Sequence, residues 1–160
     1  METKAQKLAE RLRTFNREVI SFVQSVPDPS WQKKCAGEQW PINVVARHIG
    51  AAHYGAIELA KMMIAGTPIP DGFGERITQN NAVHAAKHAD CSREEVLSIL
   101  TAKGAKVVDY VSALSDAELE TRADIPDFGG EITVKQMIEA LILRSGGEHL
   151  ESMRKTLAVN

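Results

Sequence analysis

The stretch Val44-Val45-Ala46-Arg47-His48-Ile49-Gly50 places one histidine inside an otherwise apolar pattern. Apolar residues recur along it with the spacing of a helix that packs into a core. At about 100° per residue, one face of this helix carries Val45, His48, Ala52, Leu59 and Met63. A buried histidine needs a hydrogen-bond partner or a metal ion, because its ring nitrogens are polar. His53 falls at the polar edge of the same face, so we expect it to be solvated.

A second histidine, His149, lies on the apolar face of the C-terminal segment. That face also carries Ile138, Ile142, Ser145 and Met153. Gly146 and Gly147 weaken the helix beside it and indicate close approach of another backbone or a ligand. If both faces turn into one interior, His48 and His149 meet there. Two interpretations stay open: hydrogen-bonded core residues, or ligands for zinc, nickel or iron(II) in a bundle. A catalytic metal site normally has three protein ligands, and a third is not evident.

The remaining chain favours an all-α fold. Apolar periodicity and helix-end signals predict four long helices over about 5–26, 41–66, 93–114 and 133–157, with a shorter helical segment over about 78–89. A short helical turn follows at Ser115-Asp116-Ala117-Glu118, and residues 125–130 have the composition of a loop with short extended flanks. We therefore predict a single domain, residues 1–160, that forms a four-helix bundle with a long crossover between the second and third helices.

Composition excludes several classes of function. The 160 residues carry a formal net charge of -2 and no basic face, which argues against nucleic-acid binding. No run approaches the roughly 20 apolar residues of a membrane span, and the N-terminus lacks the apolar core of a signal peptide. We expect a cytoplasmic protein that does not engage membranes, with Cys35 and Cys91 as ordinary free thiols.

A further histidine pair, His84 and His88, has the i, i+4 spacing that can chelate a metal. Asn80, Asn81 and Lys87 share its face, and alanines lie opposite. A solvated polar face accounts for this pair more simply than a metal site.

Several motifs occur in an order that resembles the DinB-like (DinB/YfiT) superfamily. They are Trp40-Pro41-Ile42-Asn43-Val44-Val45-Ala46-Arg47-His48-Ile49, Asn81-Ala82, Ser92-Arg93-Glu94-Glu95-Val96-Leu97, Leu114-Ser115-Asp116-Ala117-Glu118-Leu119 and Gly147-Glu148-His149-Leu150-Glu151-Ser152-Met153-Arg154. The resemblance implies a crossed four-helix bundle, commonly a homodimer, with a divalent metal (zinc, nickel, manganese or iron) between helices. Such proteins usually bind it through one histidine of the second helix and a His-x-x-x-His pair of the last. His48 and His149 match the first and last of these positions, and the middle one falls on Ser145.

The resemblance also implies a function. The expected protein is a divalent-metal-dependent enzyme, either a thiol-dependent transferase or hydrolase-like, with a His48/Ser145/His149 site. Its substrate would be a small molecule or a low-molecular-weight thiol. The alternative is a non-catalytic bundle that has lost its metal and serves as a small-molecule-binding or dimeric interaction protein.

Overall fold

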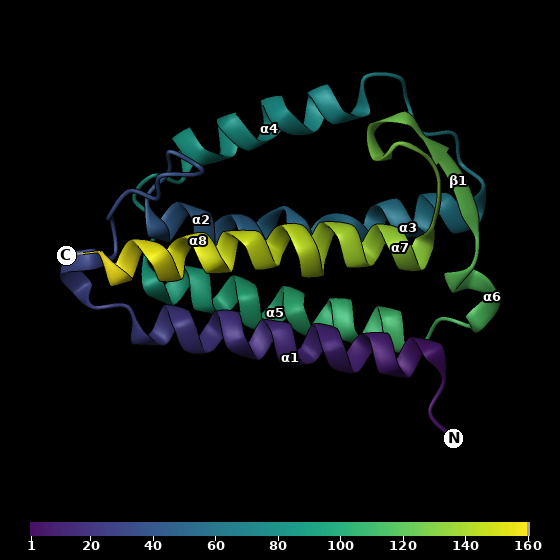
Figure 1. Ribbon diagram of the computed structural model, residues 1–160, viewed down its shortest axis with the longest axis horizontal. Helices are drawn as coiled ribbons and strands as arrows, with labels where there is room; N and C mark the ends of the chain where they lie inside the picture. The colour runs from purple at the N-terminus through teal and green to yellow at the C-terminus, as the bar shows by residue number, and fades with distance from the viewer. Residues whose placement is uncertain (160) are drawn as a thin grey trace.

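Long helices lying side by side form the body of the protein, as the computed structural model of residues 1–159 shows (Figure 1). The helices are α1 (Lys4–Ser25), α2 (Ile42–Ala51), α3 (Ala56–Ala65), α4 (Phe73–Lys87), α5 (Arg93–Ser112), α6 (Asp116–Leu119), α7 (Val134–Ile138) and α8 (Gly146–Ala158). Short 3-10 turns are η1 (Asp28–Ser30), η2 (His53–Gly55) and η3 (Pro126–Phe128), and the π-helical segment η4 (Glu139–Ser145) joins α7 to α8. This architecture confirms the predicted all-α four-helix bundle.

The predicted apolar faces are buried. Helix α1 packs on α5, α2 packs on α5 and α8, and α3 packs on α7. The core side chains on the faces predicted from periodicity are Leu8, Leu12, Val45, Leu59, Met63, Val96, Leu100, Ile138, Ile142 and Met153. Gly146 allows close packing, because a Cβ atom there would lie 3.0 Å from the Phe15 ring, whereas Gly147 faces open space. None of the described helices has both the length and the apolar character that a membrane crossing requires.

The prediction of one unbroken helix over 41–66 is wrong. Helix α2 ends at Ala51, and the chain passes through η2 before α3 begins at Ala56. The interruption starts at Ala52, whose φ of -109° and ψ of -54° depart from α-helical values. Gly55 lies inside it, and glycine is among the weakest helix formers.

The last helix is continuous, as predicted, but its central segment is π-helical and not α-helical. It begins with a reciprocal capping box in which the Thr133 hydroxyl accepts from the Gln136 amide at 3.1 Å and the Gln136 side chain accepts from the Thr133 amide at 2.9 Å. Its centre, η4, is π-helical. Such segments are rare and often occur at functional sites.

Helix α4 lies apart from the other long helices and spans the bundle between two attachments (Figure 1). At its start, the Gly74 amide donates to Asp127 Oδ2 at 3.1 Å. Asp127 lies in η3, the turn between the antiparallel strands β1 (Arg122–Ile125) and β2 (Gly130–Thr133). Beyond its end, the Asn43 side chain donates to the Ala89 carbonyl at 2.9 Å. The long crossover predicted between the second and third helices therefore contains a helical arm that is fixed at both ends.

Replacing Gly104 with alanine is expected to lower the free energy of unfolding by about 2 kcal/mol. The new Cβ would overlap the Asn16 amide, which donates to the Leu100 carbonyl at 3.1 Å and accepts from the buried Tyr54 hydroxyl at 2.6 Å. Displacing that amide leaves polar groups unpartnered. Urea denaturation measures the change, with Gly147→Ala as the control: it faces open space and should gain about 0.5 kcal/mol. A Gly104→Ala protein as stable as the control would contradict this packing.

Candidate metal centre

Three histidines from different elements form one cluster beneath α4. They are His48 of α2, His53 of η2 and His149 of α8, and one potential ligand atom from each lies within 4.8 Å of the other two. The ring centroids are 4.8 Å apart for His48 and His53, 5.3 Å for His48 and His149, and 4.9 Å for His53 and His149. The two helices therefore bring His48 and His149 together, and a third imidazole joins them.

The expectation that His53 is solvated is wrong. Its Nδ1 lies 2.6 Å from the Leu141 carbonyl oxygen in η4, and its Nε2 is buried without a hydrogen-bond partner among residues 1–159. A helical projection assumes a regular helix, and the interruption at Ala52 removes that assumption. The packing of η2 against η4 then turns the ring inward. The signal available in the sequence was Gly50 and Gly55 on either side of His53, which mark a weak helix.

The hydrogen bond of His53 determines its tautomer. A carbonyl oxygen only accepts, so Nδ1 carries the proton and Nε2 presents a lone pair. Metal-binding histidines usually have this arrangement, in which the second nitrogen donates to a carbonyl or carboxylate. The buried, unpartnered Nε2 is therefore oriented as a ligand.

Burial keeps the cluster uncharged. It lowers the pKa of His48 to about 3, helped by the neighbouring His53 and His149, and it lowers the pKa of His53 to about 4. Burial also lowers the pKa of His149, although Glu38 opposes that shift. His48 and His53 are neutral at pH 7, and a neutral imidazole is the form that binds metals.

One loop packs against the outer side of two of these rings. Trp40 contacts His48 edge to face, with centroids 5.2 Å apart. Glu38 Oε2 lies 3.8 Å from His149 Nδ1. Both loop residues were absent from the sequence-based site, because nothing in a loop sequence shows which side chains fold back onto a helix.

The other predicted candidates lie around the cluster. Ser145 ends η4 and lines a surface cavity of about 1080 Å³ with Arg144 and Glu148, among other residues, and none of the three clustered histidines lines that cavity. Its role as an oxygen ligand stays a prediction. His84 is exposed, but both His84 and His88 line a recess between α2 and α4, so the pair does not lie on the fully solvated face that we expected. The His88 side chain is only 22% exposed, and its Nδ1 lies 3.9 Å from Glu95 Oε1. Cys35 and Cys91 are buried free thiols.

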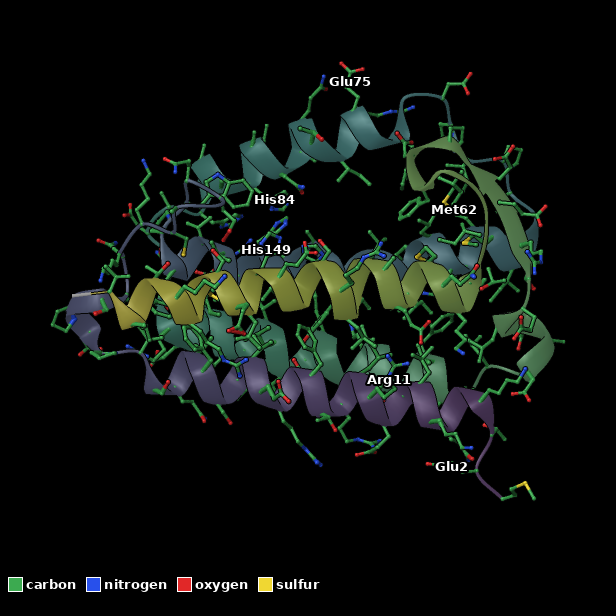
Figure 2. The ribbon with its side chains drawn as sticks, in the orientation of Figure 1. Glu2, Arg11, Met62, Glu75, His84 and His149 are labelled. Carbon is green, nitrogen blue, oxygen red and sulfur yellow. The ribbon has the colours of Figure 1, made fainter. Side chains whose placement is uncertain are left out.

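Helix α4 covers the His48 side of the cluster. Figure 2 shows His84 on the side of α4 that faces the bundle and His149 on the side of α8 that faces α4. A narrow recess between α2 and α4 is lined by His48, His84, Arg47 and Trp40, among others. Arg47 donates from Nε to Glu95 Oε1 at 2.9 Å, so this wall of the recess is already ion-paired. The recess has a volume of only about 10 Å³, so α4 closes this side of His48 to anything larger than about one water molecule.

The donor set fits a divalent transition metal. Three imidazole nitrogens in a bundle core match the three-ligand composition of catalytic zinc sites and suit nickel, copper and iron as well. Nitrogens around a tetrahedral zinc ion lie about 3.4 Å apart, so small side-chain rotations would close the 4.8 Å cluster around one ion.

The fold and the histidines together define a class: helical-bundle proteins with a histidine cluster suited to a metal between their helices. The model of the DinB superfamily matches residues 11–150, and the chain belongs to this superfamily. Among solved structures, YfiT from Bacillus subtilis, described as "a probable metal-dependent hydrolase with an unusual four-helix bundle topology", is similar with a TM-score of 0.74 at 13% identity. The match covers 96% of this chain and 85% of YfiT. No curated protein sequence matches the chain.

Proposed function

We propose that this protein is a divalent-metal-dependent enzyme of hydrolase type, with His48, His53 and His149 as the protein ligands. The observation that carries the proposal is His53 Nε2: it is buried, has no hydrogen-bond partner among the described residues, and belongs to a ring packed against the two other imidazoles. An unpartnered buried polar atom is unfavourable, and a bound ion would satisfy it.

The chain's own residues would prepare the site in three ways. The Leu141 carbonyl fixes the His53 tautomer, Trp40 holds the His48 ring from its outer side, and burial keeps His48 and His53 neutral. Helix α4 limits the access of water to the His48 side. A bound divalent ion supplies Lewis acidity toward a water, thiol or carbonyl group in such a site. The printed description of YfiT as a metal-dependent hydrolase supports the hydrolase class for this chain by analogy of fold.

His53 argues against the alternative, in which the protein is a bundle that has lost its metal. That alternative rests on the serine at position 145, where the resemblance places a ligand. With His53 beside His48 and His149, the ligand number is three without Ser145. We therefore favour metal binding over a non-catalytic bundle.

Metal loading and hydrolysis test the proposal together. The protein, purified without a histidine tag, is incubated with zinc, nickel or manganese, desalted and analysed for metal, and about one ion per chain is expected. Loaded protein should hydrolyse members of a panel of chromogenic esters and amides, and a chelator should abolish the activity. Repeating the panel with a low-molecular-weight thiol separates hydrolysis from thiol-dependent transfer. Fewer than about one ion per ten chains with every metal would overturn the proposal.

A further inference from the structure

Glu38 places a largely buried carboxylate beside the histidine cluster. Its side chain is 11% exposed, and its Oε2 atom is buried without a hydrogen-bond partner in residues 1–159. A carboxylate held away from water is unfavourable unless a partner compensates it. The Glu38 Oε2 atom lies 3.8 Å from His149 Nδ1.

This contact orients the two nitrogens of His149. With Nδ1 beside Glu38, Nε2 is the nitrogen left for the cluster, whose rings pack at 4.9 Å and 5.3 Å. A neutral imidazole has one proton, and a neighbouring carboxylate draws it to the nearer nitrogen. His53 shows the same pattern with the Leu141 carbonyl as acceptor. The difference is that Glu38 offers a charged acceptor, which makes the opposite nitrogen a stronger donor to a metal.

The loop that carries Glu38 is held in a strained shape. Gln39 has a φ of 60°, a left-handed conformation that is uncommon outside glycine. The Cys35 amide donates to the Trp40 carbonyl at 2.8 Å, and the Gln39 amide donates to the Cys35 carbonyl at 2.9 Å. The residues on either side of Gln39 both reach the cluster: Glu38 approaches His149 and Trp40 contacts His48.

We propose that Glu38 is a positioning residue that fixes the proton of His149 on Nδ1 and so presents Nε2 to the metal. This inference rests on the proposed metal site, and it names the residue that sets the ligand strength of that site. The 3.8 Å separation between Glu38 Oε2 and His149 Nδ1 is longer than a hydrogen bond, so in this structure the carboxylate acts on the ring through its charge. Glu38 also lines a surface cavity of about 630 Å³, although its Oε2 atom is buried.

The test is the tautomer of His149 in the metal-free protein, measured by ¹⁵N nuclear magnetic resonance of the imidazole nitrogens. We expect the proton on Nδ1 in the wild type and in Glu38→Gln, whose amide oxygen still accepts. Glu38→Leu should move the proton largely to Nε2. The matched control is Glu151→Gln, because Glu151 is an exposed carboxylate two residues after His149 on the same helix.

Zinc affinity, measured by competition with a chromophoric chelator, is the second readout. Glu38→Leu should weaken the affinity for zinc about 10- to 100-fold. Glu38→Gln should weaken it less, because its amide oxygen still accepts, and the control should bind zinc as the wild type does. A His149 proton on Nε2 in the wild type, or unchanged affinity in both Glu38 variants, would overturn the inference. If Glu38→Leu does not fold, the His149 tautomer in the wild type and the zinc affinity of Glu38→Gln still test the inference. Absence of zinc binding in the wild type would instead overturn the proposed function, and the tautomer would remain measurable.

Discussion

Replacing His53 with alanine is expected to reduce the affinity for zinc by more than about 100-fold. The imidazole contributes one of three nitrogens that lie within 4.8 Å of one another, and its Nε2 is already free of other partners among residues 1–159. Mutating a residue that supports a metal ligand typically lowers metal affinity roughly 10- to 100-fold. Removing a ligand itself should lower the affinity by more than that. The measurement is a competition titration with untagged protein.

Two further variants make this prediction specific. Ser145→Ala should leave the affinity unchanged, because the three imidazoles complete the ligand number without it. His84→Ala, which removes an exposed imidazole from α4, should also bind as the wild type does. If Ser145→Ala lost zinc while His53→Ala retained it, the ligand set implied by the family resemblance would be right and the assignment of His53 wrong.

Acidification is expected to destabilise the metal-free protein between pH 6.5 and about pH 3. Burial lowers the pKa of His48 to about 3 and that of His53 to about 4, whereas both return to about 6.5 when the chain unfolds. Below pH 6.5 the unfolded chain therefore binds protons that the folded chain does not. The free energy of unfolding falls as the pH falls, by on the order of 2 kcal/mol for each of these histidines at pH 5.

Urea denaturation at pH 7 and pH 5, with a chelator present, measures this loss. Carboxylates and other groups also titrate, so the informative quantity is the difference between variants. His53→Gln should lose less stability on acidification than the wild type, by on the order of 2 kcal/mol, because it has one fewer imidazole to protonate. Ser145→Ala, which alters no ionisable group, should behave as the wild type. Equal losses in wild type and His53→Gln would contradict a neutral, buried His53.

Most of the helices and the inward-facing positions of two histidines could be predicted from local pattern alone. Apolar spacing is a property of each segment, and it placed His48 and His149 on buried faces before any packing was known. His48 is 8% exposed, and its neighbours Val45 and Ile49 are fully buried. The capping residue Thr133 likewise marked the start of the last helix.

The third histidine and the residues behind the ligands depended on tertiary structure. His53 turns inward because α2 breaks at Ala52 and a carbonyl of the distant η4 segment accepts its proton. Glu38 reaches His149 across 111 positions of sequence, through a loop whose shape is set by a left-handed residue. Periodicity describes one regular helix at a time. It therefore predicts which faces are buried, whereas the partners that meet inside are decided by breaks, loops and packing between segments far apart in the chain.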